Sequence, residues 1–303
     1  MSRKTIGVLV GLAIVNLIVS LGMGQLSYFW MPPQASAEAV MVDHLFSFMT
    51  ALGSFIFLGV VGTMLYSVVF QRAAKYDSSD GPPIEGNVTL EVVWTGIPIL
   101  LVIWIGTVSY QAYQDMGILG PMDHAAHLMG QAIAAPLEPA VEEPPITVMS
   151  RQWSWEFRYP GETEVRSTEL HLPVNQRAKL KLYSEDVLHG LYVPAFRVKQ
   201  DIIPGKAIDF EFTPIREGRY RLRDSAFSGT YFASNQTNVV VESEEDFQSW
   251  LNDSANSPPA PAENLASQEY ERVKNSDAPR WETVKPAPAP LVHHSSSSQD
   301  SYE

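Results

Sequence analysis

Four arginines late in the chain have a spacing that could bind an anionic partner. Three stand at every second position and the fourth lies just before them: Arg219, Arg221, Arg223 and Arg216. Side chains alternate between the two faces of a strand, so the first three share one face and the intervening residues face inward, namely Tyr220, Leu222 and Asp224. The basic face could receive an acidic partner. A solvated strand face or a contact with lipid headgroups explains the pattern equally well.

A second cluster offers soft ligands for copper. His124 and His127 are three residues apart, with Met122 and Met129 on either side. No further ligand accompanies this pair, so a short amphipathic segment on a membrane surface is the favoured interpretation. The chain has no cysteine, which excludes disulfides, thiolate metal ligands and a lipoprotein anchor.

The composition fits a membrane part joined to one outer domain. The 303 residues carry a formal net charge of −13, which argues against nucleic-acid binding. Three apolar runs, at about residues 6–30, 45–70 and 92–113, reach the roughly 20 residues that a bilayer requires. The first run is either a retained helix or a secretory signal cleaved near Ala35-Ser36-Ala37. Its length favours a retained helix.

Basic residues orient these spans. Lys and Arg occur before the first run and just after the second, and none occurs between residues 76 and 150. Because basic loops stay in the cytoplasm, we expect the N-terminus and the loop 71–90 there, and everything after the third run on the outer side.

From Ile146 the pattern changes to the alternation of strands. A single alternation over residues 146–159 places Val148 and Ser150 on one face and Met149, Trp153 and the following aromatic residues on the other. Further short strand-like runs lie at 169–172, 178–184, 208–213, 219–225 and 237–242. They predict an antiparallel sandwich or barrel, followed by a short helix that Ser243 caps.

Several motifs resemble subunit II of haem–copper terminal oxidases. They are Asn87-Val-Thr-Leu-Glu-Val-Val-Trp-Thr-Gly-Ile-Pro98, Gln152-Trp-Ser-Trp-Glu-Phe-Arg-Tyr-Pro160, residues 184–194 and 199–205, and Glu217-Gly-Arg-Tyr220. The resemblance spans about residues 45–251. It implies a membrane-anchored fold: transmembrane α-helices (a hairpin plus an N-terminal helix or signal), then an all-β cupredoxin-like Greek-key sandwich.

The resulting domain prediction has five parts. They are an N-terminal helix or signal at 1–37, a transmembrane hairpin at 38–116, an outer linker at 117–145, a cupredoxin-like domain with a C-terminal helix at 146–252, and a largely disordered tail at 253–303, rich in Pro, Ala and Ser.

The resemblance also implies that the family's dinuclear copper centre, CuA, is degenerate here. The family holds CuA with a His and with Cys-x-Glu-x-Cys-Gly-x-x-His-x-x-Met, and the chain aligns without a gap. The six positions carry His189, Asp224, Ala226, Ser228, Phe232 and Asn235. A copper pair needs bridging thiolates, so we expect this chain to bind no metal and no cofactor. We expect His189 and Asp224 to make a charge-assisted hydrogen bond.

Two further residues match functional positions of the family. Glu91, at the cytoplasmic start of the third run, matches the mouth of a proton-uptake channel, where an acid could collect protons. A glutamate that merely favours the helix N-terminus, with Asn87 as the cap, is the alternative. Trp153 matches the aromatic residue that passes electrons to CuA. Without that acceptor, we interpret Trp153 and Trp155 as core residues.

The resemblance therefore implies a non-catalytic subunit II of a proton-motive terminal oxidase that reduces oxygen to water. Loss of CuA, and a basic face that repels a basic donor, indicate a membrane quinol instead of cytochrome c. The expected partners are subunit I, which would hold the haems and copper, and subunit III, in a bacterial plasma or thylakoid membrane. CuA-less relatives occur in quinol oxidases and in cyanobacterial alternative respiratory oxidases. The alternative function is a membrane-anchored cupredoxin-like binding or assembly module without its own electron-transfer role.

Overall fold

The computed structural model describes residues 2–72, 76, 86–118, 144–257, 264–277 and 280–284. The chain divides into two compact units, one of residues 1–31 and 42–115 and the other of residues 32–41 and 116–303. Most of the predicted outer linker lies outside the described residues, as do His124 and His127.

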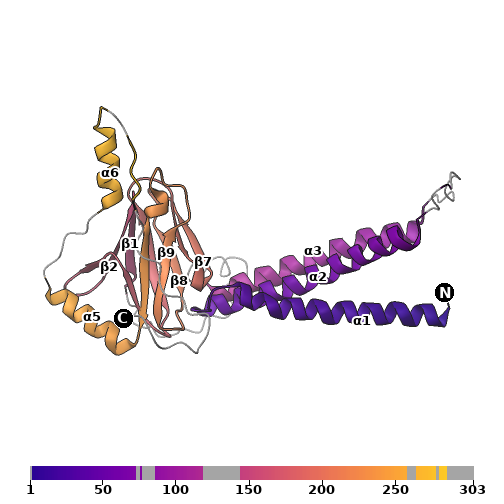
Figure 1. Cartoon of the computed structure of the whole chain (residues 1–303). Coiled ribbons are helices and arrows are strands. Elements are labelled where there is room, and N and C mark those ends of the chain that lie inside the picture. Colours follow the sequence, from indigo (N-terminus) through magenta and orange to yellow (C-terminus); the bar gives the residue numbers. More distant parts are fainter. Residues whose placement is uncertain are drawn as a thin grey trace, which may run out of the picture. The chain divides into compact units, whose positions relative to one another are not determined.

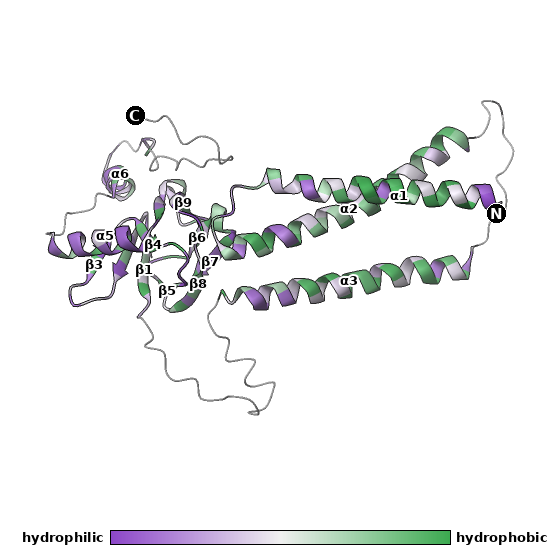
Figure 2. Cartoon of the chain, turned by 90° about the horizontal axis from the view of Figure 1, so that it is seen from below, coloured by the Kyte–Doolittle hydropathy of each residue, from purple (hydrophilic) through white to green (hydrophobic). Residues whose placement is uncertain are grey.

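Three long helices build the first unit, and each is apolar enough to cross a membrane. They are α1 Arg3–Leu26, continued by the 3-10 helix η1 Ser27–Trp30, then α2 Ala37–Phe70 and α3 Val88–Met116. Hydrophobic residues recur along the length of these helices (Figure 2), and many of their large apolar side chains are exposed, as expected for spans that face lipid or other apolar helices. The three predicted spans are therefore confirmed.

Small residues let α1 and α2 pack closely. A Cβ atom at Gly24 would lie 2.8 Å from the Ser47 carbonyl oxygen and 2.9 Å from Ala51 Cβ. Ser47 Oγ donates to the Gly24 carbonyl at 2.8 Å, and Asn16 Nδ2 donates to the Phe55 carbonyl at 3.0 Å. Such close backbone approach with interhelical hydrogen bonds is typical of helices that stay together in a membrane. The contact favours α1 as a retained helix.

The second unit is a sandwich of two five-stranded sheets, with the strand orders β3-β2-β1-β5-β8 and β4-β10-β9-β6-β7 (Figure 1). The strands are β1 Ile146–Arg151, β2 Ser154–Tyr159, β3 Val165–Ser167, β4 Leu170–Pro173, β5 Ala178–Ser184, β6 His189–Val193, β7 Val198–Ile202, β8 Ile208–Phe212, β9 Gly218–Asp224 and β10 Gln236–Glu242. Side chains from both sheets share one hydrophobic core. Membrane-length helices followed by a β-sandwich confirm the predicted fold class.

The sheets are mixed, whereas the sequence predicted antiparallel pairing. β1 runs parallel to β5, and β4 runs parallel to β10. The chain leaves the first sheet after β3, contributes β4 to the second sheet and returns as β5 beside β1. A strand that is reached through such a crossover can run parallel to its neighbour. The prediction was wrong for these two pairs.

Residues 146–159 form two strands instead of one alternating run. β1 and β2 are antiparallel partners joined by a tight turn, with Arg151 opposite Ser154. Val148 and Ser150 are fully buried in β1, and Phe157 is fully buried in β2. Because the turn resets the alternation, the predicted core face is correct for β2 and wrong for β1.

Residues 32–41, which include the first turn of α2, are built into the sandwich. Ala35 and Ser36 have no exposed surface. Ser36 Oγ donates to the Phe196 carbonyl at 2.9 Å, and the Ala35 N–H donates to the Ala195 carbonyl at 3.1 Å. The segment that could have been a signal cleavage site is therefore part of the outer core.

One arginine ties this segment to the end of α3. Glu38 is 1% exposed and accepts hydrogen bonds from Arg177 Nη1 at 2.8 Å and from the Thr213 N–H at 3.1 Å. Arg177 Nη2 also donates to the carbonyls of Met116 and Gly117, at 3.1 and 2.8 Å. A single guanidinium thus joins residue 38 to residues 116–117, all of which belong to the second unit.

Helices follow the last strand of the sandwich. Helix α5, Glu244–Asn256, begins at Ser243, whose Oγ accepts from the Asp246 N–H at 3.1 Å, so the predicted cap is confirmed. A further helix, α6 Leu265–Lys274, buries Ala266 and Val273. The described parts of the predicted tail thus contain this helix, and residues 258–263, 278–279 and 285–303 lie outside the described residues.

Replacing Arg177 by Gln should destabilise the sandwich by about 3 kcal/mol, because the buried Glu38 carboxylate loses its cation. Thermal unfolding of the detergent-solubilised chain measures the change. Arg166→Gln is the control: this arginine on β3 is exposed and pairs with Glu164, so its loss should have an effect below about 1 kcal/mol. Equal losses in the two variants would contradict the role given to Arg177.

Candidate functional site

The two residues predicted to face each other meet at adjoining strand ends. His189 begins β6 and Asp224 ends β9. The two strands are paired, with Leu191 opposite Asp224. Neither side chain has exposed surface, and His189 Nδ1 lies 2.6 Å from Asp224 Oδ2. The predicted hydrogen bond is confirmed.

Four more donors converge on the Asp224 carboxylate. Oδ1 accepts from the backbone N–H groups of Gly190 at 2.8 Å and Ala226 at 3.0 Å. Oδ2 accepts from Ser228 Oγ at 2.8 Å and from Asn235 Nδ2 at 3.1 Å. A buried carboxylate requires such donors, because it has lost its contact with water. Both oxygens of Asp224 are therefore filled by donors inside the sandwich, whereas the Asn235 Oδ1 atom of the same cluster is buried without a hydrogen-bond partner among the described residues.

Gly190 allows the close approach that this cluster needs. A Cβ atom at this position would lie 2.2 Å from Ser225 Oγ and 3.1 Å from the Ala226 nitrogen. Any larger residue would push β6 away from the loop after β9, and its N–H could then no longer reach Asp224.

The other ring nitrogen of His189 also meets a carboxylate. His189 Nε2 lies 2.8 Å from Asp186 Oδ1. The backbone N–H groups of Gln152 and Val187 donate to Asp186 at 2.8 and 2.6 Å. An imidazole with an acceptor at both nitrogens donates at both only as the imidazolium. The geometry thus favours a positively charged histidine between two aspartates.

The pKa directions agree with this arrangement. Burial works against the charged imidazolium, but hydrogen bonds to Asp224 and Asp186 outweigh it and raise the pKa of His189. Burial also works against the charged form of both carboxylates, but the bonds from His189 and from backbone N–H groups outweigh it and lower the pKa of Asp224 and of Asp186.

Most of the six degenerate copper positions come together in this cluster. His189, Ser228 and Asn235 all bond the same oxygen of Asp224. Ala226 joins through its backbone, as described above. Phe232 takes no part; it packs against Phe227 with ring centroids 5.1 Å apart. The gap-free alignment therefore identified residues that are neighbours in space.

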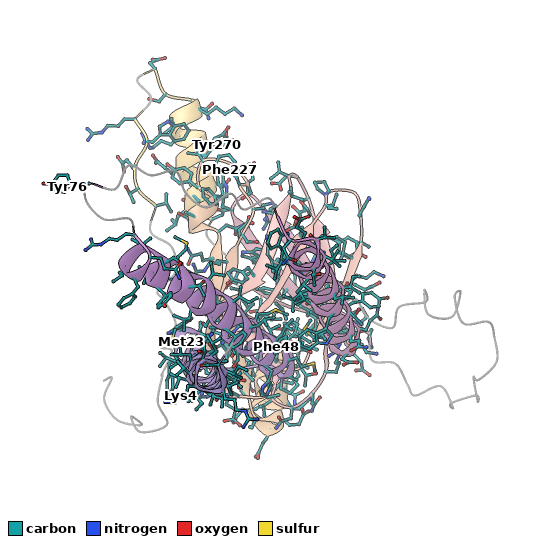
Figure 3. All side chains as sticks on the ribbon, turned by 90° about the vertical axis from the view of Figure 1, so that its right-hand side faces the viewer. Lys4, Met23, Phe48, Tyr76, Phe227 and Tyr270 are labelled. Carbon is teal, nitrogen blue, oxygen red and sulfur yellow. The ribbon has the colours of Figure 1, made fainter. Side chains whose placement is uncertain are left out.

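Trp155 and Trp153 are both buried, as predicted, but in different places. Trp155 belongs to the main core, and its ring meets His189 at 6.3 Å. Trp153 is 5% exposed and belongs to a separate aromatic cluster, where its ring lies 5.3 Å from those of Tyr231 and Tyr270. Tyr270 belongs to α6 and is labelled in Figure 3.

The C-terminal segment covers Trp153, a role that sequence reasoning missed. Tyr231 Oη donates to the Glu282 carbonyl at 2.9 Å, and Ser234 Oγ donates to the Val284 carbonyl at 2.9 Å. Trp281 stacks on Tyr270. The aromatic residues of this otherwise polar tail were the available signal, since aromatic side chains usually bury their rings.

The predicted arginine face, formed by Arg219, Arg221 and Arg223 of β9, exists with one correction. Arg219 and Arg223 are exposed, but Arg221 is 7% exposed. Arg221 lies in the middle of an inner strand, between β10 and β6, with the 3-10 helix η2 Pro194–Phe196 also packed against β9. Alternation predicted its face correctly, but neighbouring strands determine burial. Arg216 is exposed.

Glu91 lies in the first turn of α3 and is exposed. Asn87 Oδ1 accepts from the Leu90 N–H at 3.2 Å, so the predicted cap is present. An acid in this turn is favoured by the helix dipole. A role in proton uptake stays a prediction.

Comparisons with known proteins define the class. Residues 22–112 match the family "Cytochrome C oxidase subunit II, transmembrane domain", and residues 163–243 match "Cytochrome C oxidase subunit II, periplasmic domain". The chain is thus a subunit II of haem–copper oxidases, a membrane protein whose large domain lies on the periplasmic side.

Three relatives specify the likeness. Cytochrome c oxidase subunit 2 of Thermostichus vulcanus is 35% identical over 253 residues, 73% of this chain and 77% of that protein. Its counterpart in Synechocystis sp. is 32% identical over 290 residues, 87% and 85% of the two chains. Quinol oxidase subunit 2 of Bacillus subtilis is 27% identical over 229 residues, 74% and 65%. The chain belongs to the cytochrome c oxidase subunit II family.

The cluster should give the sandwich a stability optimum in mildly acidic solution. Because the pKa of His189 is raised by folding, protonated His189 stabilises the folded state fully at pH values below about 6.5, its ordinary pKa. This stabilisation is lost as the pH rises through the raised pKa. Because folding lowers the pKa of Asp224 and of Asp186, the two ionised carboxylates stabilise the folded state fully at pH values above about 3.8. This stabilisation is lost as the pH falls through the lowered pKa values.

Unfolding of the solubilised chain, followed from about pH 2 to about pH 9 in steps of about one unit, tests both sides of this window. His189→Gln should lose the decline on the alkaline side, because the variant has no imidazolium to deprotonate. An alkaline decline of the same size in His189→Gln would show that another group causes it.

Proposed function

We propose that this chain is a non-catalytic subunit II that lacks CuA, in a terminal oxidase supplied by a membrane quinol instead of cytochrome c. The observation that carries the proposal is the Asp224 cluster. Where the family holds two copper ions, this chain has a carboxylate whose two oxygens accept five hydrogen bonds.

The residues present do not fit a CuA centre. The donor set is an imidazole, a carboxylate, a hydroxyl and an amide, and the chain has no cysteine. Soft thiolates are what a copper electron-transfer pair requires. Hydrogen bonds also occupy both ring nitrogens of His189 and both oxygens of Asp224, and only Asn235 Oδ1 has no partner among the described residues. No electron-transfer step is therefore assigned to this domain.

A membrane quinol is the electron donor that suits an outer domain without a copper centre. A membrane-soluble donor can deliver its electrons within the bilayer, so it needs no copper relay in the outer domain. One relative is a quinol oxidase subunit, whereas the two more similar relatives are named as cytochrome c oxidase subunits. The haems and copper that reduce oxygen would belong to subunit I, with subunit III as a further partner. The alternative, an assembly module without an electron-transfer role, predicts purification without haem.

Turnover of the purified complex with each donor tests the proposal. We expect oxygen uptake with a short-chain quinol and none above background with reduced cytochrome c, because the outer domain has no acceptor for its electron. The copper content per complex should equal the amount held by the haem–copper site of subunit I, with no additional copper in the outer domain. Rapid oxidation of cytochrome c would overturn the proposal, and a complex without haem would favour the assembly module.

Glu91 is proposed to take up protons for the catalytic subunit. Glu91→Gln should slow oxygen reduction by the assembled complex several-fold, because the amide cannot carry a proton. Asp115→Asn, in the last turn of the same helix, is the matched control and should leave turnover unchanged. Equal turnover of the Glu91→Gln complex and the unmodified complex would reduce Glu91 to a residue that favours the helix N-terminus.

A further inference from the structure

Arg221 is a buried guanidinium without a counterion among the described residues. The residue is 7% exposed, and its Nη1 atom is buried without a hydrogen-bond partner. Burial and the neighbouring Arg223 lower the pKa of Arg221. A buried charge usually has a partner, because it is strongly disfavoured without one. The free chain therefore keeps one cation in an unfavourable state.

An unpaired acceptor lies beside this donor. Asn238 of β10 is opposite Arg221 in the strand register, and its Oδ1 atom is also buried without a partner. Its amide nitrogen is already engaged, since Asn238 Nδ2 donates to Glu169 Oε1 at 2.6 Å. In this cross-strand pair, the Arg221 guanidinium has no acceptor for its Nη1 group, and the Asn238 side chain has no donor for its Oδ1 atom.

The surrounding charges leave this face positive. Arg219 and Arg223 flank the pair on the same strand face. Glu169 is shared, because Arg219 Nη1 also approaches its Oε1 at 3.8 Å. Farther across the sheet, Lys199 and Asp201 pair with each other at 3.7 Å. The exposed Arg223 and the buried Arg221 have no carboxylate partner within the described residues.

We propose that the arginine face, together with Asn238, binds an extended acidic segment of a partner protein. Residues at every second position of a strand are about 6–7 Å apart. An extended partner with carboxylates at every second position therefore matches the three guanidinium groups. Arg–carboxylate pairs of this kind are among the strong hydrogen bonds of proteins.

A polypeptide fits this face better than a lipid headgroup. A carboxylate supplies the acceptor that Arg221 lacks, and a backbone N–H supplies the donor that Asn238 Oδ1 lacks. A phosphodiester offers only the first of these, so a lipid would have to supply the donor from a separate hydroxyl of its headgroup. Contact requires the long Arg221 side chain to change rotamer, a common adjustment in protein interfaces. This inference is independent of the electron donor.

The test uses the full chain in neutral detergent and a fluorescent peptide in which glutamate and valine alternate. We expect saturable binding that weakens as salt is added. Arg221→Gln should weaken binding at least tenfold, and Arg221→Lys should recover part of the loss. Arg166→Gln, which removes the same charge from the other sheet, should change affinity less than twofold. A peptide with glutamine for glutamate should not bind.

Two further measurements distinguish a docking residue from a structural one. Arg221→Gln should unfold no earlier than the unmodified chain, because the guanidinium has no partner in the free state. A large loss of stability would overturn the proposal. Equal peptide affinity in the Arg221→Gln and Arg166→Gln variants would also overturn it. A third outcome would overturn the proposal as well: the chain binds water-soluble dihexanoyl phosphatidylglycerol in a manner that depends on Arg221, but does not bind the peptide.

Discussion

A carboxylate without exposed surface must have its oxygens filled by donors, and Asp224 organises one end of the sandwich for this reason. Its donors come from β6, from the loop after β9 and from the residue that precedes β10. These segments are distant in sequence, so one carboxylate holds together two strands and a loop that local contacts alone would not join. In a low-dielectric interior such a network is strong when complete and unfavourable when any member is missing.

Buried charge recurs at the two other places that define this chain. Glu38 and Arg177 join the segments that link the helices to the sandwich, and there each charge has its partner. Arg221 is the contrast, because its guanidinium is buried and unpaired within the described residues. The requirement that a buried charge has a partner therefore accounts for the Asp224 cluster and for the Glu38–Arg177 pair. The same requirement indicates that the surface around Arg221 lacks a partner.

The outer domain has the fold of its family, and the proposed change concerns its chemistry. His189, Asp224, Ser228 and Asn235 form a polar cluster. The described residues among 264–284 cover Trp153, which lies beside that cluster. Both features fit the proposal that electrons no longer pass through this domain. The membrane part keeps the capped start of α3 with Glu91, which fits the proposal that proton uptake was retained.

The sequence by itself determined the local features. Apolar runs defined the spans, alternation defined most strands, and the lack of cysteine together with a gap-free motif identified the cluster residues. Tertiary structure alone decided the parallel pairs, the burial of Arg221, the place of residues 32–41 inside the sandwich and the cover that α6 forms over Trp153. Alternation and length depend on neighbours in the chain, and so they can be read from sequence. Burial and pairing depend on which distant segments lie alongside, and no local pattern carries that information.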